Sequence, residues 1–196
     1  MATSRENKTI SQFKSALIGG GARSNLFEVE LPNFPSDISW DADSFRFMCK
    51  AASMPAQTIT SIDIPFRGRT FKVAGDRSVD TWSVTVINDE GFSLRNAFEQ
   101  WSELIAKLDN NLGATDPSAY MVNAKVFQLG RGSVVSSQDN TGSSNVVLKE
   151  YEFIDIFPTE ISSIDLSYEN VDTIEEFTVT FQVQSFSVLG AGTPNG

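Results

Sequence analysis

Apolar and polar residues alternate with a period of two along several short stretches of this chain. In the clearest, TWSVTVIN at residues 81–88, Trp82, Val84 and Val86 alternate with hydroxyl residues, and EEFTVTFQVQSF at 175–186 repeats the pattern. This period is typical of strands with one buried face. The pattern predicts strands at residues 25–31, 45–53, 58–64, 65–75 (a turn and a strand), 81–88, 119–129, 146–157, 159–169 (the weakest) and 175–186.

One stretch follows a helical period instead. Apolar residues in FSLRNAFEQWSELIAKLD recur three or four positions apart, which predicts an amphipathic helix over about residues 92–108. Asn88 or Asp89 can cap its start, and NNLG at 110–113 is a natural stop. A second, shorter amphipathic helix fits ISQFKSALI at residues 10–18.

Eight or nine strands with one substantial helix, and no alternating strand–helix units, predict a mainly β fold. We expect an antiparallel β-barrel or sandwich with the helix on one flank. The domain organisation expected is a mobile N-terminal arm at 1–24, a single β-rich domain at 25–188 and a flexible tail at 189–196. Exposed loops are expected at 32–43 and 132–145, and Pro158 is expected to end a long strand.

The stretches WSVTV at 82–86 and FTVTFQVQ at 177–184 carry polar faces that are uncharged, and they contain neither lysine nor proline. Isolated domains usually protect open sheet edges with such residues, because unpaired edges join other chains. Two explanations stay open: the sheet closes on itself and leaves no edge, or its edges pair with identical neighbours in a ring.

Composition removes several function classes. Among 196 residues there is no histidine, so the usual general base, the commonest metal ligand and Ser–His activation are missing. The glycines of GGGARSN lack a phosphate-loop ending, and the adjacent carboxylates Asp89–Glu90 and Glu175–Glu176 are weak catalytic candidates. We expect no enzyme, and no catalytic, cofactor-binding or metal site.

Charge and hydropathy bear on partners. The formal net charge is −10, which disfavours nucleic-acid wrapping but suits a surface past which nucleic acid slides. No apolar run is long enough for a membrane span, and the N-terminus does not resemble a secretory signal, so a cytoplasmic origin is expected. Cys49 is interpreted as a small buried residue that shares one strand face with Phe45 and Phe47, and not as a reactive thiol.

A basic cluster interrupts this acidic chain. Four of its fifteen cations, Arg67, Arg69, Lys72 and Arg77, fall within RGRTFKVAGDR. Three interpretations remain: a nucleic-acid contact, a solvated hairpin surface, or docking against an acidic surface of another subunit. Gly68 and Gly75 supply permissive backbone, and Gly75, Asp76 and Arg77 are interpreted as a turn, in which Asp76 accepts amide hydrogen bonds or pairs with an arginine. The candidate subunit interface therefore comprises Arg67, Arg69, Lys72, Gly75, Asp76 and Arg77.

Several segments together resemble the tail tube proteins of contractile-tailed bacteriophages. They are NLFEVEL at 25–31, FMCKAASMP at 47–55, VAGDRSVDTWSVTVINDEG at 73–91, IFPTEI at 156–161 and EEFTVTFQV at 175–183. The third is long and specific, and the whole set extends over about 160 residues. The arm, the loops at 32–43 and 132–145, and the tail depart from a compact version of the family.

The resemblance implies a structural subunit that forms hexameric rings, stacked into a hollow tube inside a contractile sheath. It implies partners among identical copies, sheath, baseplate and terminator proteins, with DNA passing through the lumen without specific binding and no membrane contact. It also implies a virion component assembled in the host cytoplasm. The segment from Arg67 to Arg77 would then be a loop or hairpin that contributes to ring stacking.

Alternative functions remain within and outside the family. Related proteins with this fold serve as baseplate-proximal tube initiators, or as tubes of bacterial secretion and injection machines. From another class, a monomeric β-sandwich that binds carbohydrate would use exposed aromatic residues such as Trp40 and Tyr120.

Overall fold

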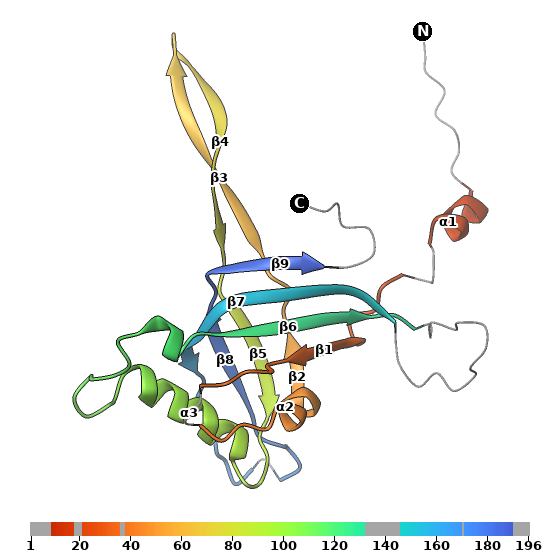
Figure 1. Ribbon diagram of the computed structural model, residues 1–196. Helices are drawn as coiled ribbons and strands as arrows, with labels where there is room; N and C mark the ends of the chain where they lie inside the picture. Colours follow the sequence, from red (N-terminus) through yellow and green to blue (C-terminus); the bar gives the residue numbers. More distant parts are fainter. Residues whose placement is uncertain (1–8, 18–20, 36–37, 132–145, 170, 190–196) are drawn as a thin grey trace.

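The computed structural model describes residues 9–17, 21–35, 38–131, 146–169 and 171–189. Nine strands and three α-helices lie in this part of the chain (Figure 1). In chain order they are α1 (Ile10–Ala16), β1 (Phe27–Glu30), α2 (Ala42–Met48), β2 (Cys49–Ala52), β3 (Gln57–Phe66), β4 (Arg69–Val79), β5 (Trp82–Ile87), α3 (Ser93–Ile105), β6 (Val122–Leu129), β7 (Val147–Ile161), β8 (Glu176–Gln182) and β9 (Ser185–Leu189), with a 3₁₀ turn at Pro117–Ala119.

The body is an antiparallel sheet in the order β1-β6-β7-β8-β5-β2, and β9 pairs with β7. The long strand β7 belongs to both halves: its earlier part pairs with β6 and β9, and its end pairs with β8. The sheet bends along β7 and encloses one core (Figure 1). This architecture confirms the mainly antiparallel β fold with a flanking helix.

The two strands with uncharged polar faces are not edge strands. β5 lies between β8 and β2, and β8 lies between β7 and β5. Their polar faces carry cross-strand contacts such as Thr85 Oγ1 to Thr178 Oγ1 at 3.1 Å. Within the described body, pairing ends at β1, β2 and β9, so these strands carry the open edges of the main sheet.

A bulge in β7 keeps two large side chains in the core. Phe153 and Ile156 are both fully buried although they are three residues apart, which breaks the two-residue period. Between them Asp155 adopts a left-handed conformation with φ 54°, and its N–H donates to Asn123 Oδ1 at 3.1 Å. One extra residue on the strand thus turns the second side chain inward again.

Two predictions about this strand were wrong. β7 does not stop at Pro158 but continues to Ile161, and Pro158 is tolerated because the register shifts between Pro158 and Glu160. The weak strand predicted over 159–169 therefore does not exist as an element of its own. Its first three residues end β7, and the described residues after Ile161 form a connection to β8.

Helix α3 closes one side of the core with four buried residues, Leu94, Ala97, Phe98 and Trp101. It confirms the predicted helix, although it is shorter than 92–108 at its C-terminus. The cap prediction was wrong: the residue before the helix is Phe92, with φ 53°, and not Asn88 or Asp89. Asp89 supports the start from further back, because its Oδ2 accepts hydrogen bonds from Ser93 N (3.2 Å) and Ser93 Oγ (2.8 Å).

The predicted strand over 45–53 was largely wrong, because residues 42–48 form α2. Asp41 caps this helix by accepting hydrogen bonds from the Asp43 and Ser44 amides. The side chains of Phe45 and Phe47 therefore do not share a face: Phe45 is buried, whereas Phe47 is 75% exposed.

Cys49 starts β2 and is half-buried, and burial raises the pKa of its thiol to about 12. This agrees with an inert thiol, although not with the strand face proposed for it.

The short N-terminal helix is confirmed as α1, which begins with a capping box between Thr9 and Gln12. None of its residues is buried. The mobile arm, the loop at 132–145 and the flexible tail remain predictions. Residues 1–8, 18–20, 132–145 and 190–196 lie outside the described residues.

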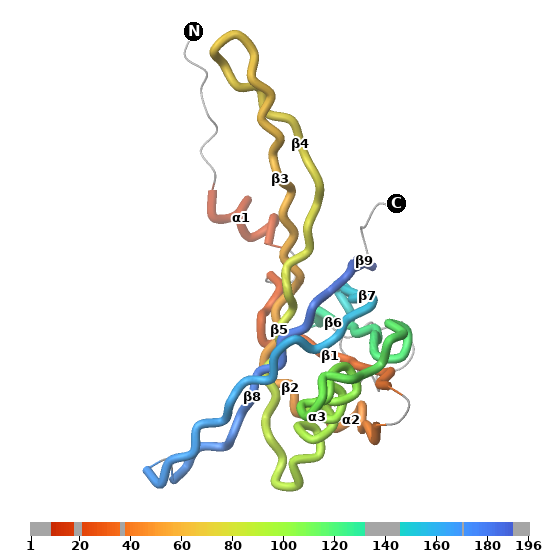
Figure 2. The backbone as a smooth tube through the Cα atoms, turned by 90° about the vertical axis from the view of Figure 1, so that its left-hand side faces the viewer, coloured from red at the N-terminus to blue at the C-terminus, as the bar shows by residue number. Residues whose placement is uncertain are grey.

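Strands β3 and β4 form a separate two-stranded sheet that extends away from the body (Figures 1 and 2). All ten residues of β3 are exposed. Figure 2 places the tip of this hairpin at one end of the molecule and the connection between β7 and β8 at the opposite end.

Candidate functional site

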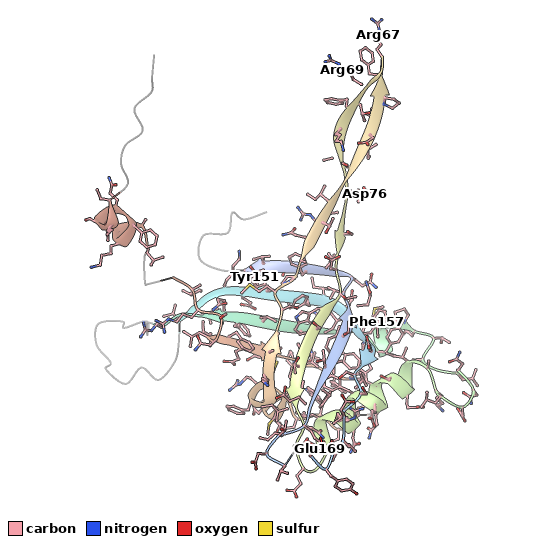
Figure 3. All side chains as sticks on the ribbon, turned by 180° about the vertical axis from the view of Figure 1, so that it is seen from behind. Arg67, Arg69, Asp76, Tyr151, Phe157 and Glu169 are labelled. Atoms are coloured by element: carbon pink, nitrogen blue, oxygen red, sulfur yellow. The ribbon has the colours of Figure 1, made fainter. Side chains whose placement is uncertain are left out.

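The hairpin turns at Arg67 and Gly68, which both have positive φ angles of 45° and 81°. Phe66 pairs with Arg69 around this two-residue loop. Positive φ at both central residues is the geometry of a type I′ turn, which matches the twist of the flanking strands. The turn places Arg67 and Arg69 at the far tip (Figure 3).

Gly75, Asp76 and Arg77 do not form the turn predicted for them. They lie in β4, halfway along the hairpin, where the register shifts between Ile59 and Ser61. A Cβ on Gly75 would meet Thr60 Oγ1 at 2.6 Å, so the residue is glycine because the other strand passes too close. Thr60 Oγ1 donates to the backbone oxygen of Asp76 at 3.2 Å, which fixes the irregularity.

The six candidate interface residues all lie on the hairpin, but they are spread along its length. Lys72 is paired across the strands with Asp63 (Nζ to Oδ1 3.6 Å). Within the described part of the chain the guanidinium groups of Arg67, Arg69 and Arg77 form no ion pair, and Arg67 lies over the Phe66 ring at 5.5 Å. The tip is therefore a region of uncompensated positive charge.

Sequence reasoning missed the apolar face of the hairpin. Ile62 pairs with Val73, and Ile64 pairs with Phe71, so these side chains share one face with Phe66. We call the five residues Ile62, Ile64, Phe66, Phe71 and Val73 the apolar stripe; each is between 39% and 67% exposed. The alternation in the sequence indicated a strand with one apolar face. It did not indicate that this face stays exposed among the described residues.

The opposite end of the molecule carries a different surface. We call the described residues 162–169 and 171–176 the foot; they include five carboxylates and no basic residue. The foot also exposes large apolar side chains, namely Leu166, Tyr168, Val171 and Ile174. Glu169 of the foot and Arg67 of the hairpin lie at opposite ends in Figure 3.

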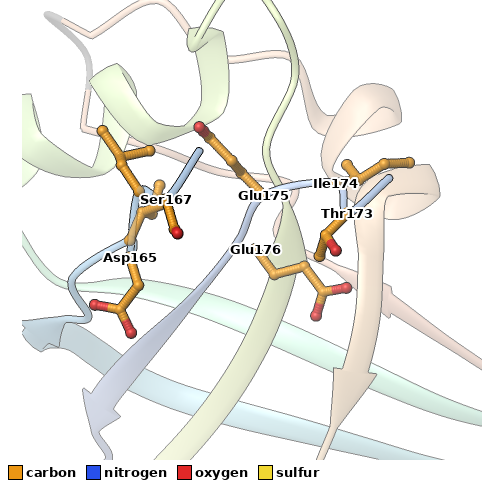
Figure 4. Close-up of a pocket in the computed structure, with 8 residues that line it drawn as sticks. Asp165, Ser167, Thr173, Ile174, Glu175 and Glu176 are labelled. Atoms are coloured by element: carbon orange, nitrogen blue, oxygen red, sulfur yellow. The ribbon is translucent and has the colours of Figure 1, made fainter. Parts of the chain in front are cut away.

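A pocket of about 340 Å³ opens in the foot (Figure 4). Ile164, Leu166 and Ile174 provide its apolar lining, and Asp165 and Glu176 extend to the same side. Glu176 is paired with Lys50, whereas Glu175 accepts a hydrogen bond from Asn88 Nδ2 at 2.9 Å. Asp165 has no ion pair among the described residues.

The other candidate chemistry does not assemble into a site. Trp40 stacks on Phe34 with ring centroids 4.2 Å apart and donates its Nε1–H to Leu31 O, so it is not an exposed sugar-stacking surface. Tyr120 packs edge-on against Phe157. Within the described residues, no group of three possible metal-ligating side chains is arranged around one point. None of the described helices has the length and apolar character needed to cross a membrane.

Comparison with known proteins agrees with the sequence resemblance. The family described as phage tail tube protein matches residues 22–189. The tail tube protein gp19 of Enterobacteria phage T4 is 34% identical over 162 residues, which cover 83% of this chain and 88% of that protein. The gp19 of phage T6 is 33% identical over the same length and coverage.

Solved structures show the same fold at low identity. A chain of the sheath–tube complex of an extracellular contractile injection system has a TM-score of 0.59 and 12% identity, with 94% of this chain and 100% of that chain covered. A chain of the six-fold symmetrised baseplate of the anti-feeding prophage has a TM-score of 0.58 and 12% identity, with 88% and 98% covered.

The phage relatives are tail tube proteins, components of the virion, which confirms the expectation of a structural subunit in place of an enzyme. On this match over most of its length, the chain belongs to the phage tail tube protein family.

Proposed function

We propose that this chain is the repeating subunit of a phage tail tube: copies form hexameric rings, and the rings stack into a hollow conduit for DNA inside a contractile sheath. The observation that carries the proposal is the β3–β4 hairpin, a long two-stranded ribbon with an apolar stripe that nothing in the described subunit covers. Because the chain belongs to the phage tail tube family, we infer that the partner of this ribbon is another subunit of the tube.

An isolated two-stranded ribbon is marginally stable in water, and an exposed apolar stripe marks a contact surface. When the ribbon packs against a second subunit, the contact stabilises it and removes the apolar stripe from water. Because the hairpin projects at one end only, such contacts join copies head to tail and generate a polymer (Figures 1 and 2). A ribbon ten residues long reaches roughly 33 Å from its base, enough to contact a subunit in the next layer.

The structural relatives support the proposed partners. One belongs to a complex of tube with sheath, another to a six-fold symmetrised baseplate, and others to a tube cap and a sheath/tube terminator. We infer that this chain contacts sheath, baseplate and terminator proteins in the same way. Assembly in the host cytoplasm completes this proposal.

The acidic balance supports the role of a DNA conduit. A net charge of −10 gives a surface that repels phosphates, so DNA passes through the lumen without adhering. The basic groups concentrate on the hairpin, where the proposal places them in contacts between rings. This arrangement disfavours nucleic-acid binding as their role.

A tube of an injection machine, or a baseplate-proximal initiator, is the second candidate. The injection-system chains match the fold over nearly their whole length. The main phage tube is favoured because 34% identity to a phage tail tube protein far exceeds the 12% shared with those chains.

Electron microscopy of the purified full chain tests the proposal. We expect rings or tubes with six-fold symmetry, formed alone or on added baseplate. Class averages with another symmetry refute the hexamer. A chain that remains monomeric at high concentration, with baseplate present, contradicts the tube function itself. Mapping of the lumen surface provides a separate check, since a basic inner wall would refute the proposed repulsion of DNA.

A further inference from the structure

We propose that the hairpin tip of one subunit docks into the foot pocket of a second copy in the adjacent ring, with Phe66 entering the pocket. This inference rests on the proposed function, since it names the surface that receives the hairpin. It assigns a role to two features that the core does not use: the uncompensated cations at the tip and the acidic, apolar foot.

Charge complementarity selects the partner. The tip from Ile64 to Phe71 contains two basic residues, Arg67 and Arg69, and no acidic one, whereas the foot contains five acidic residues and no basic one. Arg67 and Arg69 form no ion pair in the described subunit, and neither does Asp165 at the pocket. Opposed patches of this kind steer association and fix the register of two surfaces.

Apolar complementarity acts at the same place. Phe66 is 67% exposed at the end of the apolar stripe, and Ile174 beside the pocket is equally exposed. The pocket has apolar walls of Ile164, Leu166 and Ile174 with the Asp165 and Glu176 carboxylates at its side (Figure 4). A phenyl ring flanked by guanidinium groups matches such a lining, because the ring leaves water while the charges remain paired at the rim.

Position in the molecule completes the argument. Arg67 and Glu169 lie at opposite ends (Figure 3), so a shift of one copy along this direction brings the tip of one subunit to the foot of the next. The contact is heterologous and repeats without limit, as the stacking of rings requires.

Helix α1 is the alternative occupant of the stripe. Ile10 and Phe13 of the helix and Leu17 at its C-cap are exposed and apolar, but the only charged residue of α1 is Lys14, which cannot compensate the basic tip. The foot is favoured because it offers both the apolar and the acidic half of the contact.

A charge swap tests the proposal in the full chain. One variant carries Arg67→Glu with Arg69→Glu, a second carries Asp165→Lys with Asp172→Lys, and a third combines all four. We expect each half variant to raise the concentration needed for tube formation about tenfold or more, and the combined variant to return it towards that of the unaltered chain. Half variants that assemble normally, or a combined variant no better than its halves, overturn the proposal.

A matched control reverses charges away from both ends, with Lys107→Glu and Asp109→Lys, two exposed positions in the loop after α3. It is expected to assemble normally. For the aromatic contact, Phe66→Ala is compared with Phe47→Ala, an exposed phenylalanine on α2. Only the first is expected to release rings from tubes, and equal behaviour of the two counts against insertion of Phe66.

Disulfide trapping gives a readout that does not depend on the strength of assembly. In a Cys49→Ala background, Thr70→Cys with Ser167→Cys is expected to give a ladder of cross-linked chains in tubes and none in dispersed subunits. Tubes without a ladder overturn the proposal, as does cross-linking of Thr70→Cys to Phe13→Cys instead. An unaltered chain that forms neither rings nor tubes refutes the proposed function itself, before any variant is compared.

Discussion

Gly75 lies against Thr60 across the hairpin so closely that a Cβ on Gly75 would come within 2.6 Å of the Thr60 Oγ1 and 3.1 Å of its backbone oxygen. Gly75→Ala therefore has to push the two strands apart at the irregularity. Because the hairpin is separate from the core, we expect the variant to keep its melting temperature but to assemble poorly. Thermal unfolding and electron microscopy measure the two effects.

The double variant Thr60→Ala with Gly75→Ala shows how much of the assembly defect comes from the clash with the Thr60 hydroxyl and how much from the clash with the Thr60 backbone oxygen. It removes the hydroxyl but leaves the backbone oxygen, so assembly is expected to recover only in part. An alanine at Gly75 that assembles as the unaltered chain does would show that the close approach has no role in the contact.

Phe98 on α3 is fully buried and forms aromatic contacts with Phe45, Phe177 and Phe181. Phe98→Ala leaves a cavity at the centre of this cluster and is expected to lower the free energy of unfolding by about 3–5 kcal/mol. Phe47→Ala on the exposed side of α2 is the control, with an expected change within about 0.5 kcal/mol. Similar losses in urea denaturation would contradict the assignment of the core.

Asp89 accepts two hydrogen bonds from Ser93 at the start of α3. Burial raises the pKa of its carboxyl, but the hydrogen bonds from Ser93 and from neighbouring backbone amides together outweigh burial, and the net pKa is lowered. Asp89→Ala is expected to lower the free energy of unfolding by about 1 kcal/mol at pH 7, since an acceptor for a first-turn amide is lost.

The lowered pKa fixes the pH dependence of this contribution. It is complete above the unfolded pKa of about 3.9 and is lost as pH falls through the lower folded pKa. The stability difference between the unaltered chain and Asp89→Ala should therefore be constant from pH 7 to about pH 5 and shrink below about pH 4. A difference that grows on acidification would refute this account.

Cys49 is expected to resist alkylation, since burial raises its pKa to about 12 and thiolate is the reactive form. At pH 8 the folded chain should react with iodoacetamide roughly a hundredfold more slowly than the chain in denaturant. Mass spectrometry over time measures both rates. Comparable rates would show that the start of β2 opens readily.

The candidate subunit interface drawn from the sequence also includes Arg77, which lies in β4 away from the hairpin tip. Arg69→Glu with Arg77→Glu should shorten tubes without unfolding the subunit, because unpaired cations on the hairpin then become anions facing an acidic partner. Arg69→Glu alone tells whether Arg77 contributes. Tube lengths that equal those of the unaltered chain would exclude both residues from stacking.

The sequence by itself determined the strands whose burial alternates without interruption. In β5 and β8 each apolar side chain enters the core in register with its neighbour, Val84 opposite Val179, so pattern and structure coincide. Helix α3 was equally predictable, since its apolar residues recur at the helical period. Two of the segments that carry the family resemblance, 73–91 and 175–183, contain these regular strands.

Only the tertiary structure decided the rest. Phe45 and Phe47 alternate as in a strand, yet the Asp41 cap and the burial of Phe45 make residues 42–48 helical, because local pattern is a weaker constraint than packing. The bulge at Asp155 cannot be predicted from pattern, since it depends on the strand paired with it.

The hairpin separates most clearly what the sequence pattern determined from what the tertiary structure decided. The alternation of Ile62, Ile64 and Phe66 indicated a strand with an apolar face, as β3 is. Which surface that face meets depends on the tertiary structure. The hairpin extends away from the body, so these side chains remain exposed in the described subunit. Burial is decided by where the ribbon lies relative to the body, and the sequence pattern of a strand carries no information on that position.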